Sequence, residues 1–319
     1  MKAPRNADCE TLNRRFGAPG RIVFRPSKHD APIVVLANQY GSAEVALFGA
    51  QTLSYRPTGN PPVLYLPHPY DETPAGAEIH GGIPVCWPWF ARCGPAGSKL
   101  HGVARYARWR VTGSEYSEDV TEVTLALESD AETRKAWPHD FALELKVSVS
   151  MKLTLALRAT NTGTEAFHVT EGFHPYFLVR DAVACKVRGV DGKTFCDTLT
   201  QPAPFTKDSF AKKWEGDLVV EGERDHVFDA PNGEYALFDP GVNRTIVIRS
   251  RGNKKLIVWH PAPSYSEGKI GPGEGARMVC VEPATIFRDE GYWLEPGAKH
   301  ELRMAIQSDP NDGSVHARN

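Results

Sequence analysis

The sequence lacks long hydrophobic runs and has no excess of charge of either sign. Its 319 residues include 37 Lys and Arg against 39 Asp and Glu, a formal net charge of −2. Nucleic-acid binding usually requires a basic surplus, so the composition argues against a polyanion partner. No window approaches the roughly 18–20 consecutive apolar residues that a membrane-spanning helix needs, and residues 1–20 have no apolar stretch typical of a secretory signal. We therefore expect a cytoplasmic protein with no nucleic-acid or membrane partner.

Cysteine is scarce, and several well-known catalytic signatures are missing. Six cysteines in a chain of this length are too few for a disulfide scaffold, and no two of them form a C-x-x-C pair. We expect reduced, mostly buried thiols. The sequence also contains no G-x-S-x-G elbow, no phosphate-binding loop, no dinucleotide-binding G-x-G-x-x-G after a strand and no H-E-x-x-H. The sequence therefore argues against a nucleotide-binding enzyme and against hydride transfer.

What the sequence does contain is strand-type alternation. From Phe141 to Leu157 every odd position is apolar, while most even positions are small or polar. This period of two predicts a sheet with one buried face. Seventeen residues at about 3.3 Å each would extend roughly 55 Å, well beyond an ordinary strand. We therefore predict two strands joined by a bend or tight hairpin near residues 150–152.

Strand-like runs recur along the chain, separated by turn-forming residues. The further runs are 33–38, 43–48, 120–127, 244–249, 256–259, 278–281 and 301–307, and the 28 Gly and 25 Pro supply the reversals. Helical patterning is limited to short stretches at 131–137 and 208–214. The predicted fold is all-β, a large antiparallel sandwich with a few short helices. We expect one domain over residues 21–308, with loosely held ends at 1–20 and 309–319.

Candidate site residues gather in short clusters of histidine, glycine, aromatic and charged residues. These clusters are HGGIPVCWPWF (80–90), HGVAR (101–105), EGFHPYF (171–177), RDH (224–226), WHP (259–261) and EP (282–283). Taken singly, each histidine is more typical of a packed residue at a strand end than of a ligand. The glycines that follow His80 and His101 indicate close backbone approach at both places. Pro283 is expected to end the strand that carries Glu282.

Together these clusters resemble the hexose-6-phosphate mutarotases within the galactose mutarotase-like aldose 1-epimerases. The resemblance runs from about residue 41 to residue 306, with the motifs in family order. It implies a β-supersandwich, a sugar bound in a cleft, no metal or organic cofactor, and a monomeric protein, as family members often are. It also implies acid–base catalysis by the histidine of HPYF and the glutamate before the terminal proline, which correspond here to His174 and Glu282.

The resemblance assigns a role to each of the other candidate residues. Glu282 would accept the anomeric proton while His174, as an imidazolium, donates one to the ring oxygen; one such pair suffices for ring opening and reclosure. His101 would bind the ring oxygen or a neighbouring hydroxyl, and Asp225 would accept hydrogen bonds from sugar hydroxyls. Arg105 would pair with the 6-phosphate, a task that suits its forked donors.

The departures from the family pattern bear on the substrate. His80 stands where the family commonly has a phosphate-binding arginine, and His226 and His260 replace an arginine and an asparagine. A neutral imidazole lacks the arginine's charge and most of its donors. A hexose 6-phosphate is the first expectation, and a mutarotase of an unphosphorylated aldose remains open. A non-catalytic carbohydrate-binding sandwich is the third reading, although a pure binder needs no paired acid and base.

Overall fold

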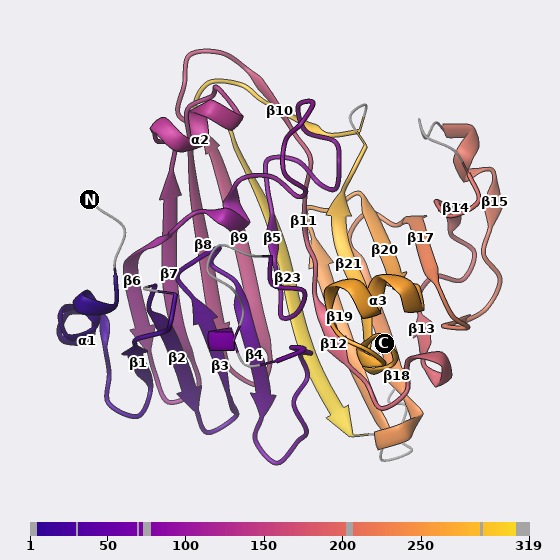
Figure 1. The fold of residues 1–319 in the computed structure, drawn as a ribbon, viewed down its shortest axis with the longest axis horizontal. Coiled ribbons are helices and arrows are strands. Elements are labelled where there is room, and N and C mark those ends of the chain that lie inside the picture. The colour runs from indigo at the N-terminus through magenta and orange to yellow at the C-terminus, as the bar shows by residue number, and fades with distance from the viewer. Residues whose placement is uncertain are drawn as a thin grey trace.

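The computed structural model describes residues 5–29, 31–68, 70–72, 78–201, 207–287 and 290–310. These residues form mainly antiparallel sheets with three short α-helices, which are Cys9–Phe16 (α1), Ala131–Ala136 (α2) and Pro263–Lys269 (α3). Figure 1 shows the long strands standing side by side, with α1 and α2 at the margins and α3 drawn over the strands. Within the described ranges, no helix has the length and apolarity needed to cross a membrane. The predicted all-β fold with a few short helices is confirmed.

The largest sheet has nine strands in the order β16-β13-β18-β19-β23-β9-β8-β7-β6. In that order its strands are Leu218–Val219 (β16), Lys186–Arg188 (β13), Gly233–Asp239 (β18), Arg244–Arg251 (β19), Lys299–Pro310 (β23), Leu153–Asn161 (β9), Phe141–Val149 (β8), Thr121–Glu128 (β7) and Arg110–Tyr116 (β6). β8 and β9 form the predicted hairpin, which turns where the Ser150 amide donates to the Lys152 carbonyl at 2.9 Å. The alternating apolar residues of β8 are buried in the core.

A second sheet of eight strands carries most of the polar clusters. Its order is β15-β14-β17-β20-β21-β11-β5, and β12 also pairs with β21. The strands are Lys212–Lys213 (β15), Thr194–Asp197 (β14), Arg224–Asp229 (β17), Lys255–His260 (β20), Met278–Thr285 (β21), Glu171–Phe173 (β11), Val85–Cys86 (β5) and Tyr176–Leu178 (β12).

Two smaller sheets and several single-turn 3₁₀ helices complete the described chain. The four-stranded sheet consists of Ile22–Arg25 (β1), Ile33–Asn38 (β2), Gly41–Ala46 (β3) and Thr52–Pro57 (β4), and the two-stranded sheet of Phe167–Val169 (β10) and Tyr292–Leu294 (β22). The 3₁₀ helices are Asn6–Asp8, Tyr70–Glu72, Ala104–Tyr106, Ala182–Ala184, Lys207–Phe210, Pro240–Val242 and Glu274–Arg277. One continuous hydrophobic cluster, from Leu12 to Ile306 in sequence, packs between the sheets.

The two ends of the chain depart from expectation in the part that is described. Residues 9–16 are not loosely held, because α1 packs on the sandwich through Leu12, which lies in the core cluster. The Asn13 side chain also exchanges two hydrogen bonds of 2.8 Å with the backbone of Phe24. At the other end β23 continues through Pro310, past the predicted limit at 308. Residues 311–319 lie outside the described residues.

Candidate active site

Strand pairing brings the separate sequence clusters together. β5, from the GGIPVCWPWF segment, pairs with β11, which leads into HPYF, so that Gly172 lies opposite Cys86. The His174 amide then donates to the Pro84 carbonyl at 3.1 Å, which fixes the backbone of the histidine. On its other side β11 pairs with β21, the strand that carries Glu282. Residues far apart in the sequence thus meet on neighbouring strands.

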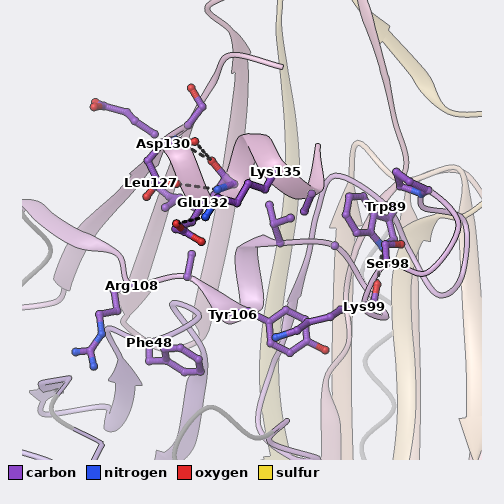
Figure 2. A pocket seen from close by; sticks show the side chains of 18 of the residues that line it. Phe48, Trp89, Ser98, Lys99, Tyr106, Arg108, Leu127, Asp130, Glu132 and Lys135 are labelled. Atoms are coloured by element: carbon purple, nitrogen blue, oxygen red, sulfur yellow. Dashed lines mark hydrogen bonds and ion pairs between the residues drawn. The ribbon is translucent and has the colours of Figure 1, made fainter. Parts of the chain in front are cut away.

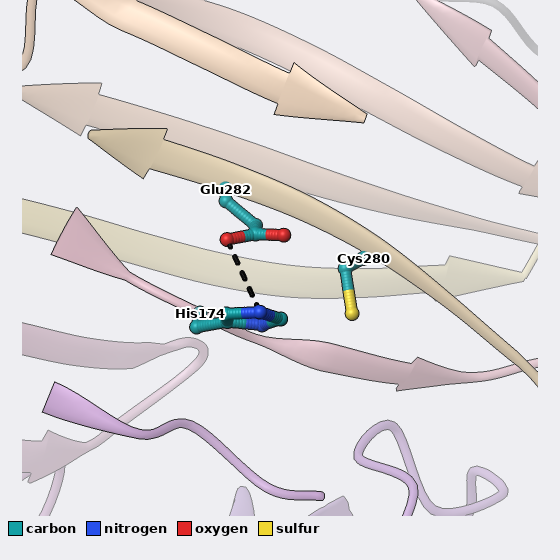
Figure 3. Close-up of side chains that lie close together, drawn as sticks. All are labelled: His174, Cys280 and Glu282. Carbon is teal, nitrogen blue, oxygen red and sulfur yellow. Dashed lines mark ion pairs between the residues drawn. The ribbon is translucent and has the colours of Figure 1, made fainter. Parts of the chain in front are cut away.

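A local gap in the eight-stranded sheet places His174 beside Glu282. β21 pairs with β11 at its C-terminal end and with β12 at its N-terminal end, and His174 and Pro175 lie between those two short strands. Proline has no amide hydrogen for a ladder bond, which favours an interruption here. His174 Nε2 lies 3.6 Å from Glu282 Oε2 across the gap (Figure 3). The expectation that Pro283 ends the strand is wrong: β21 continues to Thr285, with Pro283 opposite Leu256.

The pair is buried and only partly hydrogen-bonded. Glu282 is 1% exposed and His174 is 8% exposed, and among the described residues neither Glu282 Oε2 nor His174 Nδ1 has a hydrogen-bond partner. Burial raises the pKa of the Glu282 carboxyl well above its usual range and lowers the pKa of the His174 imidazole, which the nearby Arg105 charge lowers further. Both shifts favour neutral groups, so the pair holds one proton, on the carboxyl. The carboxylate–imidazolium form expected from the sequence contains the same single proton.

Aromatic rings fix the orientation of the His174 imidazole. Tyr176 stacks on it at 4.8 Å between ring centroids, and Phe90 lies nearly parallel to it at 6.3 Å. Trp259 and His101 present their edges to the ring, at 5.8 and 5.4 Å. A catalytic histidine needs this kind of restraint, because proton transfer depends on the direction of the ring nitrogen.

His101 is held as a hydrogen-bond donor by the backbone around it. Its Nδ1 accepts from the Ala91 amide at 3.2 Å, while its own amide donates to the Ala91 carbonyl at 3.0 Å. A neutral imidazole has one protonated nitrogen, so the proton resides on Nε2. Burial lowers the pKa of His101 well below its usual value and preserves this neutral state. The next residue, Gly102, has φ +82° and lies so close to the Trp87 carbonyl that a Cβ would overlap the oxygen. The sequence predicts this close backbone approach.

One cavity of about 880 Å³ contains all the predicted site residues. Its walls include His80, His101, Arg105, His174, Asp225 and Glu282. Burial raises the pKa of the Asp225 carboxyl, and the nearby Asp197 and Glu223 add to this effect. By contrast, His226 and His260 do not line the cavity. His226 stacks on Phe195, and His260 lies between two backbone carbonyls, so these two departures from the family pattern do not alter the cavity wall.

At one end of the cavity lies a buried cation without a counter-ion. Arg105 is 6% exposed, and within the described part of the chain its guanidinium has no hydrogen-bond partner and no carboxylate within 4 Å. The closest aromatic contact is the Tyr106 ring, 5.6 Å away. Leaving a buried charge uncompensated is costly, so this arrangement favours an anionic ligand.

His80 is a neutral neighbour of this cation. Its Nδ1 lies 3.3 Å from the Tyr265 hydroxyl, and its Nε2 lies 3.6 Å from Glu78 Oε2. Burial lowers the pKa of His80 to about 4, with the Arg105 charge contributing. Glu78 in turn accepts a hydrogen bond from the Tyr106 hydroxyl. His80 therefore lines the cavity as predicted, but it adds no positive charge near neutral pH.

Several cavity residues are not predicted from the sequence as site residues, and Glu78, Tyr265 and Trp259 are examples. Glu78 precedes the HGG segment without a recognisable signal, and Tyr265 lies on α3, which has weak helical patterning. Trp259 lies within a segment that does stand out, but its contact with His174 depends on how β20 and β21 pair. Phe90, the last residue of the HGGIPVCWPWF segment, also lines the cavity.

A second cavity, of about 1100 Å³, lies behind the segment that carries His101. Its lining includes Trp89, Lys99, Tyr106 and Arg108 (Figure 2). Some of its charged side chains pair with each other, as Lys135 does with Glu132 at 2.6 Å. None of the six predicted site residues lines it. The acid–base pair therefore identifies the smaller cavity as the candidate active site.

Comparison with known proteins identifies the family of the chain. The family model for aldose 1-epimerase matches residues 32–307. A Salmonella typhimurium protein provisionally named glucose-6-phosphate 1-epimerase is 31% identical over 281 residues, covering 85% of this chain and 90% of the relative. An Escherichia coli protein with the same provisional name is 30% identical over 268 residues, covering 82% of this chain and 86% of the relative.

Solved structures show the same fold. The crystal structure of a provisionally named mutarotase from Salmonella typhimurium superposes with a TM-score of 0.80 at 26% identity, covering 94% of this chain and all of that one. A galactose mutarotase-like protein from Clostridium acetobutylicum has a TM-score of 0.70 at 15% identity, covering 91% of this chain and 98% of that one; this likeness concerns the fold alone. The chain belongs to the aldose 1-epimerase family and is an isomerase with the galactose mutarotase-like fold.

Proposed function

We propose that this protein interconverts the α and β anomers of a hexose 6-phosphate, with His174 and Glu282 as the proton-transferring pair. The observation that carries the proposal is the content of one cavity: a buried carboxyl 3.6 Å from a buried imidazole, together with a buried guanidinium that has no counter-ion within the described residues. The first feature suits ring opening, and the second suits a phosphate group. The provisional names of the relatives point to the same substrate class.

The chemistry needs one base and one acid. Removal of the proton from the C1 hydroxyl forms the aldehyde carbonyl while the bond from C1 to the ring oxygen breaks and that oxygen takes a proton. Rotation about the C1–C2 bond then presents the other carbonyl face, and reclosure reverses both transfers. No proton is gained or lost over the cycle, so one shared proton is sufficient.

In this proposal Glu282 accepts the anomeric proton and His174 donates to the ring oxygen. The neutral pair that burial favours and the carboxylate–imidazolium pair required for this step differ only in the location of one proton. A bound sugar supplies hydroxyl groups and thereby reduces the desolvation that keeps both groups neutral. Each positioned transfer contributes about 10²- to 10⁴-fold to the rate.

The remaining cavity residues orient the sugar. His101 Nε2 donates to the ring oxygen or an adjacent hydroxyl, Asp225 accepts from hydroxyl groups, and Arg105 pairs with the 6-phosphate. His80 contributes a neutral wall near the same end. These assignments agree with the chemistry of each side chain and with its position in the cavity.

A second candidate substrate is an unphosphorylated aldose. Glu78 carries a carboxylate at the same end of the cavity as Arg105, and neighbouring positive charges together with the Tyr106 hydroxyl lower its pKa. That negative charge opposes a phosphate and would suit a neutral sugar hydroxyl. Arg105 nevertheless remains buried without an ion pair among the described residues, which favours the phosphorylated sugar.

The deciding experiment is anomer-exchange NMR with glucose 6-phosphate and glucose. We expect the wild-type protein to accelerate exchange of the phosphorylated sugar with the higher kcat/KM. Greater or equal acceleration with glucose would overturn the phosphate assignment. Saturable sugar binding with no acceleration of either exchange would instead support the non-catalytic binder.

Arg105→Ala provides the corresponding variant. Loss of a charge-assisted contact of about 1.5–3 kcal/mol should reduce the preference for glucose 6-phosphate over glucose by about 10- to 100-fold. The matched control is Arg110→Ala, which removes a partly exposed arginine that pairs with Glu128 outside the cavity. This control should leave the preference unchanged.

A further inference from the structure

A third metal-ligating side chain lies beside the acid–base pair. Cys280 and Glu282 are two residues apart on β21, so their side chains project from the same face of the strand. One ligand atom from each of His174, Cys280 and Glu282 lies within 4.8 Å of the other two (Figure 3). No other set of three His, Cys, Asp or Glu side chains meets this condition within the ranges that the structure describes.

The donor set suits one class of cation. An imidazole nitrogen, a thiolate sulfur and a carboxylate oxygen are the ligands of Zn²⁺ and similar borderline divalent ions, whereas Mg²⁺ and Ca²⁺ prefer oxygen alone. Ordinary Zn–N, Zn–O and Zn–S bonds give tetrahedral ligand-to-ligand separations of roughly 3.3–3.6 Å. The distance of 3.6 Å between His174 Nε2 and Glu282 Oε2 already matches such an edge. The Cys280 sulfur lies within 4.8 Å of the other two ligand atoms, so each of these separations is within roughly 1.5 Å of a tetrahedral edge.

The side chains that carry the ligand atoms are buried, and their hydrogen-bonding capacity is only partly used. Glu282 is 1% exposed, and its Oε2 has no hydrogen-bond partner in the part of the chain that the structure describes. Cys280 is fully buried in a hydrophobic cluster with Tyr65, Tyr176 and Met278. Its sulfur lies within 4.8 Å of the ligand atoms of His174 and Glu282. Because His174 and Glu282 line the cavity, a cation between the three atoms would keep its fourth coordination position toward the sugar site.

We infer that His174, Cys280 and Glu282 form a binding site for a zinc-like divalent cation, and that its occupancy excludes the sugar reaction. The cation would bind the lone pair of His174 Nε2 and the Glu282 carboxylate, the groups that otherwise exchange protons with the sugar. The Cys280 thiol and the Glu282 carboxyl would each release a proton to solvent on binding. The ion is an inhibitor in this account and takes no part in the anomerisation. Only the inhibitory consequence rests on the proposed function; the binding site itself does not.

The binding test uses Co²⁺ as a spectroscopic probe on the full-length, metal-free protein. We expect one equivalent of Co²⁺ to give the visible bands of a tetrahedral site together with a near-ultraviolet thiolate-to-cobalt band, both displaced by Zn²⁺. In Cys280→Ala the thiolate band should vanish and Zn²⁺ should bind more weakly by more than about tenfold. Cys185→Ala, a matched substitution of another fully buried cysteine, should retain the band.

Wild-type protein that shows no thiolate band overturns the site, as does Cys280→Ala that binds Zn²⁺ as tightly as wild type. Cys280→Ser, which keeps the side-chain shape, serves if the alanine variant does not fold. In parallel, Zn²⁺ should slow anomer exchange and a chelator should restore it. Tight Zn²⁺ binding that leaves a measurable anomer exchange unchanged would overturn the inhibitory role alone. Absence of anomerisation in the metal-free protein would count against the proposed function and leave the binding result intact.

Discussion

At the residue level, the backbone conformation of Gly102 positions His101. Gly97 and Gly102 both have positive φ, at +76° and +82°, but only Gly102 lies against another backbone segment. Gly97→Ala should therefore cost about 1–2 kcal/mol from conformation alone. Gly102→Ala should cost more, about 3 kcal/mol, and should also lower kcat/KM because its Cβ would displace the segment that carries His101.

Urea unfolding of the two glycine variants tests this difference, with anomer-exchange NMR as the activity readout. Equal losses of stability would show that the contact with the Trp87 carbonyl is unimportant. Unchanged activity in Gly102→Ala would show that His101 does not depend on this turn.

The sequence supports prediction of site residues to different degrees. His174 and Glu282 stand in distinctive segments, and the structure brings them together in one cavity. Glu78 and Tyr265 could not be predicted, because their approach to His80 depends on tertiary contacts between a loop and α3. The neutral state of the His174–Glu282 pair could not be predicted from the sequence either, because reference pKa values contain no information on burial.

At the level of elements, the β8–β9 hairpin separates a buried face from an exposed one. Leu145 is fully buried, whereas its neighbour Lys146 is partly exposed and pairs with Glu122 at 3.3 Å. Leu145→Ala should lower the free energy of unfolding by about 2–5 kcal/mol. Lys146→Ala should change it by less than about 1 kcal/mol. Denaturant titration of both variants measures the difference, and similar losses would contradict the assigned faces.

Alternation predicted the strands better than proline predicted their ends. The period of two from 141 to 157 located both strands and the turn of this hairpin. The prediction from Pro283 was wrong because proline ends a strand only where its missing amide hydrogen is needed for a ladder bond. Part of β21 lies opposite the interruption between β11 and β12, where no such bond is needed. The interruption could not be inferred from either segment alone, because it arises from the pairing of distant strands.

For the whole molecule, buried neutral histidines should make stability fall in acid. Burial lowers the pKa of His80 from its ordinary 6.5 to about 4. Between these values the unfolded chain binds a proton that the folded protein excludes. This contribution is therefore fully present above about pH 6.5 and is lost as the pH falls toward 4. Its size is about 1–3 kcal/mol.

Urea unfolding at several pH values should show a shallower loss of stability in His80→Gln than in wild type. The m value should stay the same, since it reports the surface exposed on unfolding. Identical pH dependence in the two proteins would contradict the burial of a neutral His80.

We also propose that residues 21–308 form a single domain, because one hydrophobic cluster joins residues from nearly the whole chain. The sequence could support this only indirectly, through the absence of a linker. The docking of α1 was missed because the charge of the first twenty residues obscured the apolar contribution of Leu12.

The most direct test of the account is the rate of anomer exchange in glucose 6-phosphate with Glu282→Gln and His174→Asn. Glu282→Gln keeps the side-chain shape, His174→Asn keeps a shorter polar side chain, and both remove the proton-transferring group. We therefore predict losses of about 10²- to 10⁴-fold in kcat with the fold retained. Glu301→Gln, at a surface carboxylate paired with Arg158, is the matched control and should retain full activity. Exchange by either site variant at the wild-type rate would contradict the central claim that this buried pair opens and closes the sugar ring.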